Sequence, residues 1–120
     1  MIRIDVTPGR EVMATIQAEV RARGITNAAI ILIGAVDLAT ISTMSAADHS
    51  VDQEYSYLEP LELSGTGEVV GGEVHVHVTL GRQDRVAVFG HLHCAMVQNF
   101  FVHAYVTPVR AEAGPVRSAS

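Results

Sequence analysis

Apolar and polar residues alternate along much of the chain, which is the spacing of half-buried β-strands. Residues 2–6 (IRIDV) predict a first strand of this kind. Residues 27–44 form a nearly continuous β-branched run, broken at Gly34 and Asp37, which predicts two buried strands (27–34 and 38–43) around a tight turn. A polar loop is expected at 45–54, and further strands are expected at 55–70 with a break near Pro60, in a hairpin at 73–93, and at 97–107.

Only one segment repeats with the period of a helix. Val12, Ile16 and Val20 recur every four residues, which predicts a helix with one apolar face. Thr7 suits the N-cap of this helix, and Gly24 suits a left-handed stop. One early helix followed by about seven strands predicts an α+β fold, in which the helix packs on a largely antiparallel sheet.

The size and charge of the chain narrow the classes of function. Its 120 residues, 48% of them hydrophobic, are enough for one domain with a substantial core. We expect that domain at 1–108 and a disordered tail at 109–120. Thirteen acidic residues outnumber eight arginines, with no lysine, and the net charge is −5. This balance argues against a broad basic surface for nucleic acid, so DNA is not an expected partner.

Three features of the sequence bear on its compartment. Cys94 is the single cysteine, so an intrachain disulfide is excluded. The N-terminus lacks the apolar core of a signal peptide. The apolar run at 28–36 is too short to span a bilayer. These features predict a cytoplasmic protein.

The strongest chemical signal is a pair of His-x-His motifs within residues 73–93, EVHVHVTLGRQDRVAVFGHLH. Residues two apart in a strand share a face, so each strand of this hairpin has one apolar face and one face with two histidines. Closing the hairpin with the polar loop 81–85 keeps the apolar faces together. It places His75 opposite His91 and His77 opposite Phe89.

Three imidazoles would then lie within about 5–8 Å of one another on one sheet face. Imidazole nitrogen suits Zn, Cu, Fe or Ni, and three histidines with an open fourth position are typical of catalytic zinc sites. The alternative is that these histidines only line a solvated sheet face. We predict that His75, His77 and His91 bind Zn²⁺ or another divalent transition metal.

The neighbours of this trio are ambiguous. His93 continues the same face opposite Glu73, as a fourth ligand, a pocket base or a simple cross-strand partner of that carboxylate. Strand parity turns Cys94 toward the apolar face, where it is expected to be a small core residue. His49 lies in the polar loop and is expected to be solvated.

A ligand pocket could use further side chains from the last strand. His103 shares a face there with Phe101 and Tyr105. We name His93 and His103 as candidate acid–base residues, and Phe89, Phe101 and Tyr105 as candidate walls of the pocket.

The residues quoted so far resemble the PPC ("plants and prokaryotes conserved") domain family over residues 3–107. The resemblance is carried by RIDVTPGREVMATI, IILIGAVDLATIS, VHVHVTL and FGHLHCAMV. It implies a small homotrimer with a metal held by three histidines, which the matching motifs place at His75, His77 and His91. Cupins also use His-x-His on a strand, but the Glu that follows it in cupins is missing after His77.

The chain also departs from the family pattern. Phe89 stands where the family has the first glycine of Gly-Gly-His, and Val102 or His103 stands where the last strand often carries a Glu. The Arg-Gly-Arg-Pro core of the AT-hook is absent. Three functions therefore stay open: a metal-centred small-molecule site in a homotrimer, with or without catalysis; a DNA-associated regulator; and a trimer with a purely structural metal.

Overall fold

A computed structural model describes residues 1–110 of the chain, and the strand order places the histidine hairpin in the middle of a single sheet. Within these residues the fold has one helix and nine strands, which confirms the α+β class and exceeds the expected strand number by about two. Most of the expected tail lies outside the described residues. The elements are β1 (Ile2–Val6), β2 (Arg10–Glu11), α1 (Val12–Ala22), β3 (Asn27–Val36), β4 (Leu38–Met44), β5 (Asp52–Tyr57), β6 (Leu61–Val70), β7 (Glu73–Gly81), β8 (Ala87–Val97) and β9 (Val102–Pro108).

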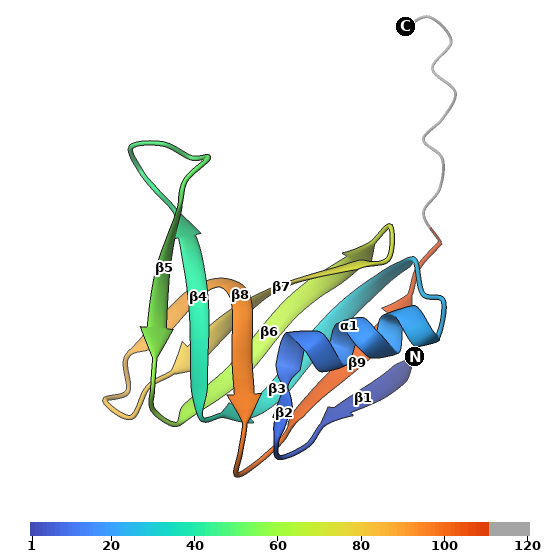
Figure 1. Ribbon diagram of the computed structural model, residues 1–120, viewed down its shortest axis with the longest axis horizontal. Helices are drawn as coiled ribbons and strands as arrows, with labels where there is room; N and C mark the ends of the chain where they lie inside the picture. The colour runs from blue at the N-terminus through green and yellow to red at the C-terminus, as the bar shows by residue number, and fades with distance from the viewer. Residues whose placement is uncertain (111–120) are drawn as a thin grey trace, which may run out of the picture.

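All pairings in the sheet are antiparallel, in the order β1-β9-β3-β6-β7-β8-β4-β5, with β2 paired to β8. The strands β3 and β4 are consecutive in the chain but do not pair. In the sheet, β6, β7 and β8 lie between them, so the chain crosses from one half of the sheet to the other at Asp37. Figure 1 shows the β4–β5 hairpin reaching beyond the rest of the sheet, with α1 lying across the other half.

Helix α1 closes the core. Its three apolar residues, Val12, Ile16 and Val20, are completely buried, as the periodicity predicts. The helix contacts β1, β7 and β8, so one apolar stripe joins strands from both halves of the sheet. Within residues 1–110 no helix has the length and hydropathy needed to cross a lipid bilayer.

The start of the helix differs from the prediction. The chain turns at Thr7–Gly9, forms the short strand β2, and begins the helix only at Val12. Glu11, not Thr7, is the N-cap: its carboxylate accepts hydrogen bonds from the backbone N–H groups of Met13 (2.9 Å) and Ala14 (2.8 Å). The same carboxylate accepts a bond from Ala95 N on β8, which a local sequence pattern does not reveal.

The expected loop at 45–54 is too long, because β5 already begins at Asp52. The glycines after Leu63 also do not interrupt β6. Gly65 and Gly67 lie inside that strand, where β7 approaches very closely. A Cβ atom on Gly67 would collide with the carbonyl oxygen of His75. These glycines therefore allow close contact with the histidine strand.

A β-bulge in β8 changes which side chains face the core. Thr40 of β4 pairs with Cys94, but Ile41 pairs with Leu92, so His93 is the extra residue. The buried positions shift accordingly, from Leu92 to Ala95 and then Val97. The expectation that Cys94 is a core residue is therefore wrong, and its side chain is only partly buried.

Candidate metal centre

The histidine hairpin consists of β7 and β8, and burial decides which way its side chains point. Val76, Val78 and Leu80 of β7 are completely buried, so His75 and His77 project from the opposite face of the sheet. In the observed register His77 pairs with His91 and Thr79 pairs with Phe89. The predicted pairs, His75 with His91 and His77 with Phe89, are therefore wrong.

The loop explains the difference. It spans residues 82–86 rather than 81–85, and Arg82 N donates to Val86 O (3.0 Å) while Arg85 N donates to Arg82 O (2.9 Å). Arg85 adopts the left-handed conformation that closes this turn (φ 68°). Moving the loop by one residue keeps every valine on the same face, so the apolar pattern cannot distinguish the two registers.

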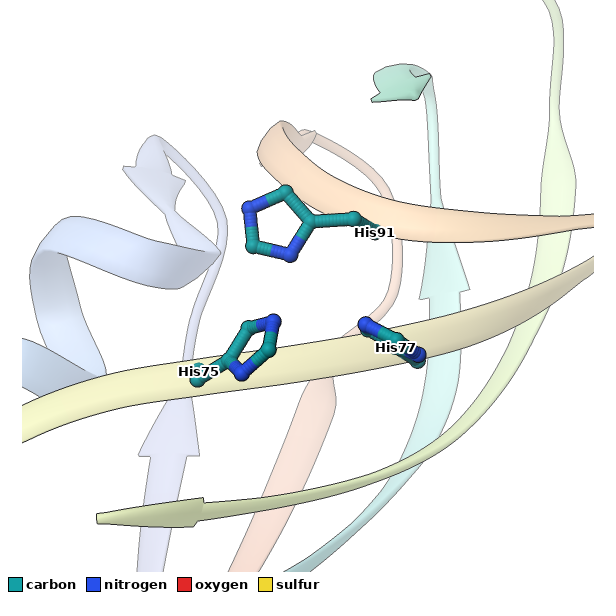
Figure 2. A group of neighbouring side chains, drawn as sticks. All are labelled: His75, His77 and His91. Carbon is teal, nitrogen blue, oxygen red and sulfur yellow. The ribbon is translucent and has the colours of Figure 1, made fainter. Parts of the chain in front are cut away.

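The structure brings the three predicted imidazoles together. One ring nitrogen from each of His75, His77 and His91 lies within 4.8 Å of the other two. The ring centroid of His75 is 4.9 Å from that of His77 and 4.7 Å from that of His91. Figure 2 shows a nitrogen of each ring turned toward the space among the three side chains.

The environment of His91 suits a metal ligand. Its Nδ1 atom is buried and has no hydrogen-bond partner among the described residues. Burial lowers the pKa of His91, and the nearby His75, His93 and His77 lower it further. The lowered pKa favours the neutral imidazole, and no other residue from 1 to 110 satisfies its buried Nδ1, although leaving a buried polar atom unpaired is costly. A divalent ion bound by the three rings would remove this cost, so the residues present fit a metal.

His93 lies beside the trio but does not belong to its group of converging ring nitrogens. Its Nε2 lies 2.7 Å from Ser42 Oγ on β4, and its Nδ1 lies 3.8 Å from a carboxylate oxygen of Glu54 on β5. The bulge turns the ring toward these strands, so the expected pair with Glu73 does not form; Glu73 instead lies 3.5 Å from Arg21. His93 still packs edge-on against His91, at a centroid distance of 4.9 Å.

Of the candidate wall and acid–base residues, the structure brings Phe89 to the trio and leaves three others apart. The ring of Phe89 lies 5.7 Å from that of His77. Phe101, His103 and Tyr105 belong to β9 or the residue before it, and β3 and β6 separate β9 from β7. Three strand spacings are about 14 Å, so these side chains do not line the same site within one chain. His103 instead lies 3.7 Å from Asp5 of β1.

A hollow of about 480 Å³ lies beside the three histidines. Phe89 and residues of the β4–β5 hairpin line it with them, including Ser42, Met44 and Asp52. Ser42 and Asp52 were not predicted from the sequence, because both lie far from the histidines along the chain. One weak signal was available. A strand predicted to begin at Asp52, in place of a loop that ends at residue 54, would have placed the Asp52 carboxylate on a strand.

Comparisons with known proteins agree on the fold. A family model described as "Plants and Prokaryotes Conserved (PCC) domain" matches residues 1–109. A metal-containing protein from Archaeoglobus fulgidus is 29% identical, with a TM-score of 0.79, over 93% of this chain and 81% of that chain. A PPC protein from Pyrococcus horikoshii is 26% identical, with a TM-score of 0.82, over 92% and 79%.

A putative DNA-binding protein from Bacteroides thetaiotaomicron is also similar, with 23% identity and a TM-score of 0.79 over 92% of this chain and 79% of that chain. At that identity the likeness concerns the fold alone. No curated protein matches the sequence significantly.

Proposed function

Because the chain belongs to the Plants and Prokaryotes Conserved domain family, we propose that it binds one divalent transition metal, Zn²⁺ in the first instance, through His75, His77 and His91. The observation that carries this proposal is the convergence of three ring nitrogens, one of which is buried and has no hydrogen-bond partner in the described part of the chain. The similar protein from Archaeoglobus fulgidus is described as containing a metal, which supports it.

The metal site would serve a small molecule rather than act only as a structural staple. Three protein ligands leave one position of a tetrahedral zinc ion open, and the hollow of about 480 Å³ has room for a ligand there. A bound ion would supply a Lewis acid that polarises an oxygen of the ligand. Phe89 forms an apolar wall of this hollow. His93 packs against His91 but does not line the hollow, so an acid–base role for His93 would require its ring to turn from Ser42.

We also propose that the protein is a homotrimer, in the cytoplasm. Large apolar side chains are exposed on the face that carries the histidines, among them Ile31 (59%), Ile33 (56%), Phe89 (58%) and Phe101 (43%). Exposed apolar patches of this kind commonly mark interfaces. An interface there would bury the two isoleucines, and it would give Phe101, His103 and Tyr105 a route to the metal site of a neighbouring copy.

Metal content after zinc loading tests the central proposal. We expect about one zinc per chain in the wild type, and zinc affinity at least about 100-fold lower in His75→Ala, His77→Ala and His91→Ala, because a lost ligand should exceed the 10–100-fold cost typical of a lost supporting contact. His93→Ala is the matched control and should keep its zinc.

Elemental analysis measures the stoichiometry, and competition with a chelator measures the affinity. A wild-type protein that holds almost no zinc after loading, or a His75→Ala variant with undiminished affinity, would refute the metal site. If His93→Ala lost as much affinity as His75→Ala, the site would be a closed four-histidine staple with no open position.

A further inference from the structure

Of the residues from 1 to 110, Asp52 is the one carboxylate that lines the hollow shared by all three histidines. It reaches this position through the sheet order, since β5 pairs with β4 and β4 pairs with the histidine strand β8. In that arrangement Asp52 pairs with Met44, while Ser42 pairs with His91.

The Asp52 carboxylate is not a metal ligand in this arrangement. Its oxygens lie outside the group of ligand atoms within 4.8 Å that His75, His77 and His91 form. Within residues 1–110 its side chain also makes no hydrogen bond or ion pair of its own. The other nearby acids differ: Glu54 lies beside His93, and Glu68 lines a separate hollow on the far side of His75.

This placement has a consequence for the ligand. A divalent ion on three neutral imidazoles keeps two positive charges, so an oxygen anion suits its open position. A carboxylate across the hollow accepts hydrogen bonds and donates none, and hydrogen bonds to ionised groups are the stronger ones. A ligand with a hydroxyl or ammonium group near its metal-binding oxygen would satisfy both the ion and Asp52. A ligand without such a donor would leave the carboxylate facing a second anion.

The remaining walls set the size and polarity of the ligand. Phe89 and Met44 are both largely exposed and line the hollow, so the part of the ligand between them is apolar. We propose that Asp52 makes the metal site selective for small molecules that carry a hydrogen-bond donor beside the oxygen that binds the metal. This inference rests on the proposed function of the three histidines as metal ligands.

The test uses the full chain loaded with Co²⁺, whose visible spectrum reports both metal binding and ligand exchange. Acetate, glycolate and glycine are titrated into the wild type and into Asp52→Ala. We expect the preference for glycolate and glycine over acetate to fall at least tenfold in Asp52→Ala, with Co²⁺ affinity unchanged. Comparing the two proteins cancels any preference that comes from chelation by the ligand itself.

Glu68→Gln is the matched control, because it removes a carboxylate of the same sheet face from outside this hollow, and it should keep the wild-type preference. A ratio within twofold of the wild type in Asp52→Ala would overturn the selectivity while leaving the metal site intact. So would a loss of Co²⁺ as large as that of His75→Ala, since Asp52 would then be a ligand. A wild type that shows no Co²⁺ bands would instead overturn the metal site itself.

Discussion

His91 shows how the fold changes the chemistry of one residue. Burial, and then the neighbouring histidines, hold the pKa of His91 below its ordinary value of about 6.5. As the pH falls through 6.5, the unfolded chain takes up a proton at this residue before the folded chain does. We therefore predict that the metal-free protein loses thermal stability below about pH 6.5, and that His91→Gln loses less.

Thermal unfolding of chelator-treated protein between pH 7.5 and 5 measures this effect. His49→Gln is a suitable control, because His49 lies in the exposed loop between β4 and β5. An unchanged pH dependence in His91→Gln would contradict the prediction. The sequence identified His91 as a candidate ligand, but its burial depends on the strands around it.

At the scale of elements, the close approach of β6 and β7 holds the histidine strand in place. Gly67 pairs with Val76, and a Cβ atom there would collide with the backbone of His75. We predict that Gly67→Ala lowers the free energy of unfolding by about 1–3 kcal/mol, the usual cost of overpacking. It should also weaken zinc binding, because the strand that would be displaced carries His75 and His77.

Denaturant unfolding and a zinc titration measure the two effects. Ser64→Ala, at an exposed position of the same strand, should change neither quantity. A Gly67→Ala variant with wild-type stability and zinc affinity would show that the strands can separate without cost. The sequence predicted a break near Pro60 but not the role of these glycines, because glycine disfavours strands unless another backbone approaches it closely, and only the fold shows that approach.

At the scale of the whole molecule, a single chain leaves large apolar side chains on one face of the sheet exposed to water. Ile31 and Ile33 project from β3, an interior strand of the sheet, on the face opposite the core. We predict the mass of three chains for the wild type, and a smaller assembly for Ile33→Asp, because a carboxylate at such an interface would lose its hydration.

Light scattering at micromolar concentration measures the mass. Val51→Asp serves as the control, since Val51 is comparably exposed but lies in the loop before β5. A wild-type mass of one chain would contradict the trimer. The sequence alone did not predict that this apolar face is exposed. In a continuous apolar run the isoleucines occupy both faces of the strand, and the pattern does not show which face lies in the core.

The sequence by itself determined the fold class, the buried stripe of the helix and the face that His75, His77 and His91 share. These follow from periodicity, because side chains in strands alternate strictly and those in helices recur every three to four residues. A shift of the pairing by two positions keeps each side chain on its face, so the three histidines lie together as predicted although their predicted pairing was wrong.

Only the tertiary structure decided the register, the bulge and the walls of the site. The loop bonds of Arg82 selected the pairing of His77 with His91, and the bulge in β8 moved Cys94 out of the core and His93 toward Ser42. Asp52 reached the histidines because β5 folds back along β4. Each of these depends on hydrogen bonds between strands that are distant in sequence, and no local pattern of apolar and polar residues encodes such contacts.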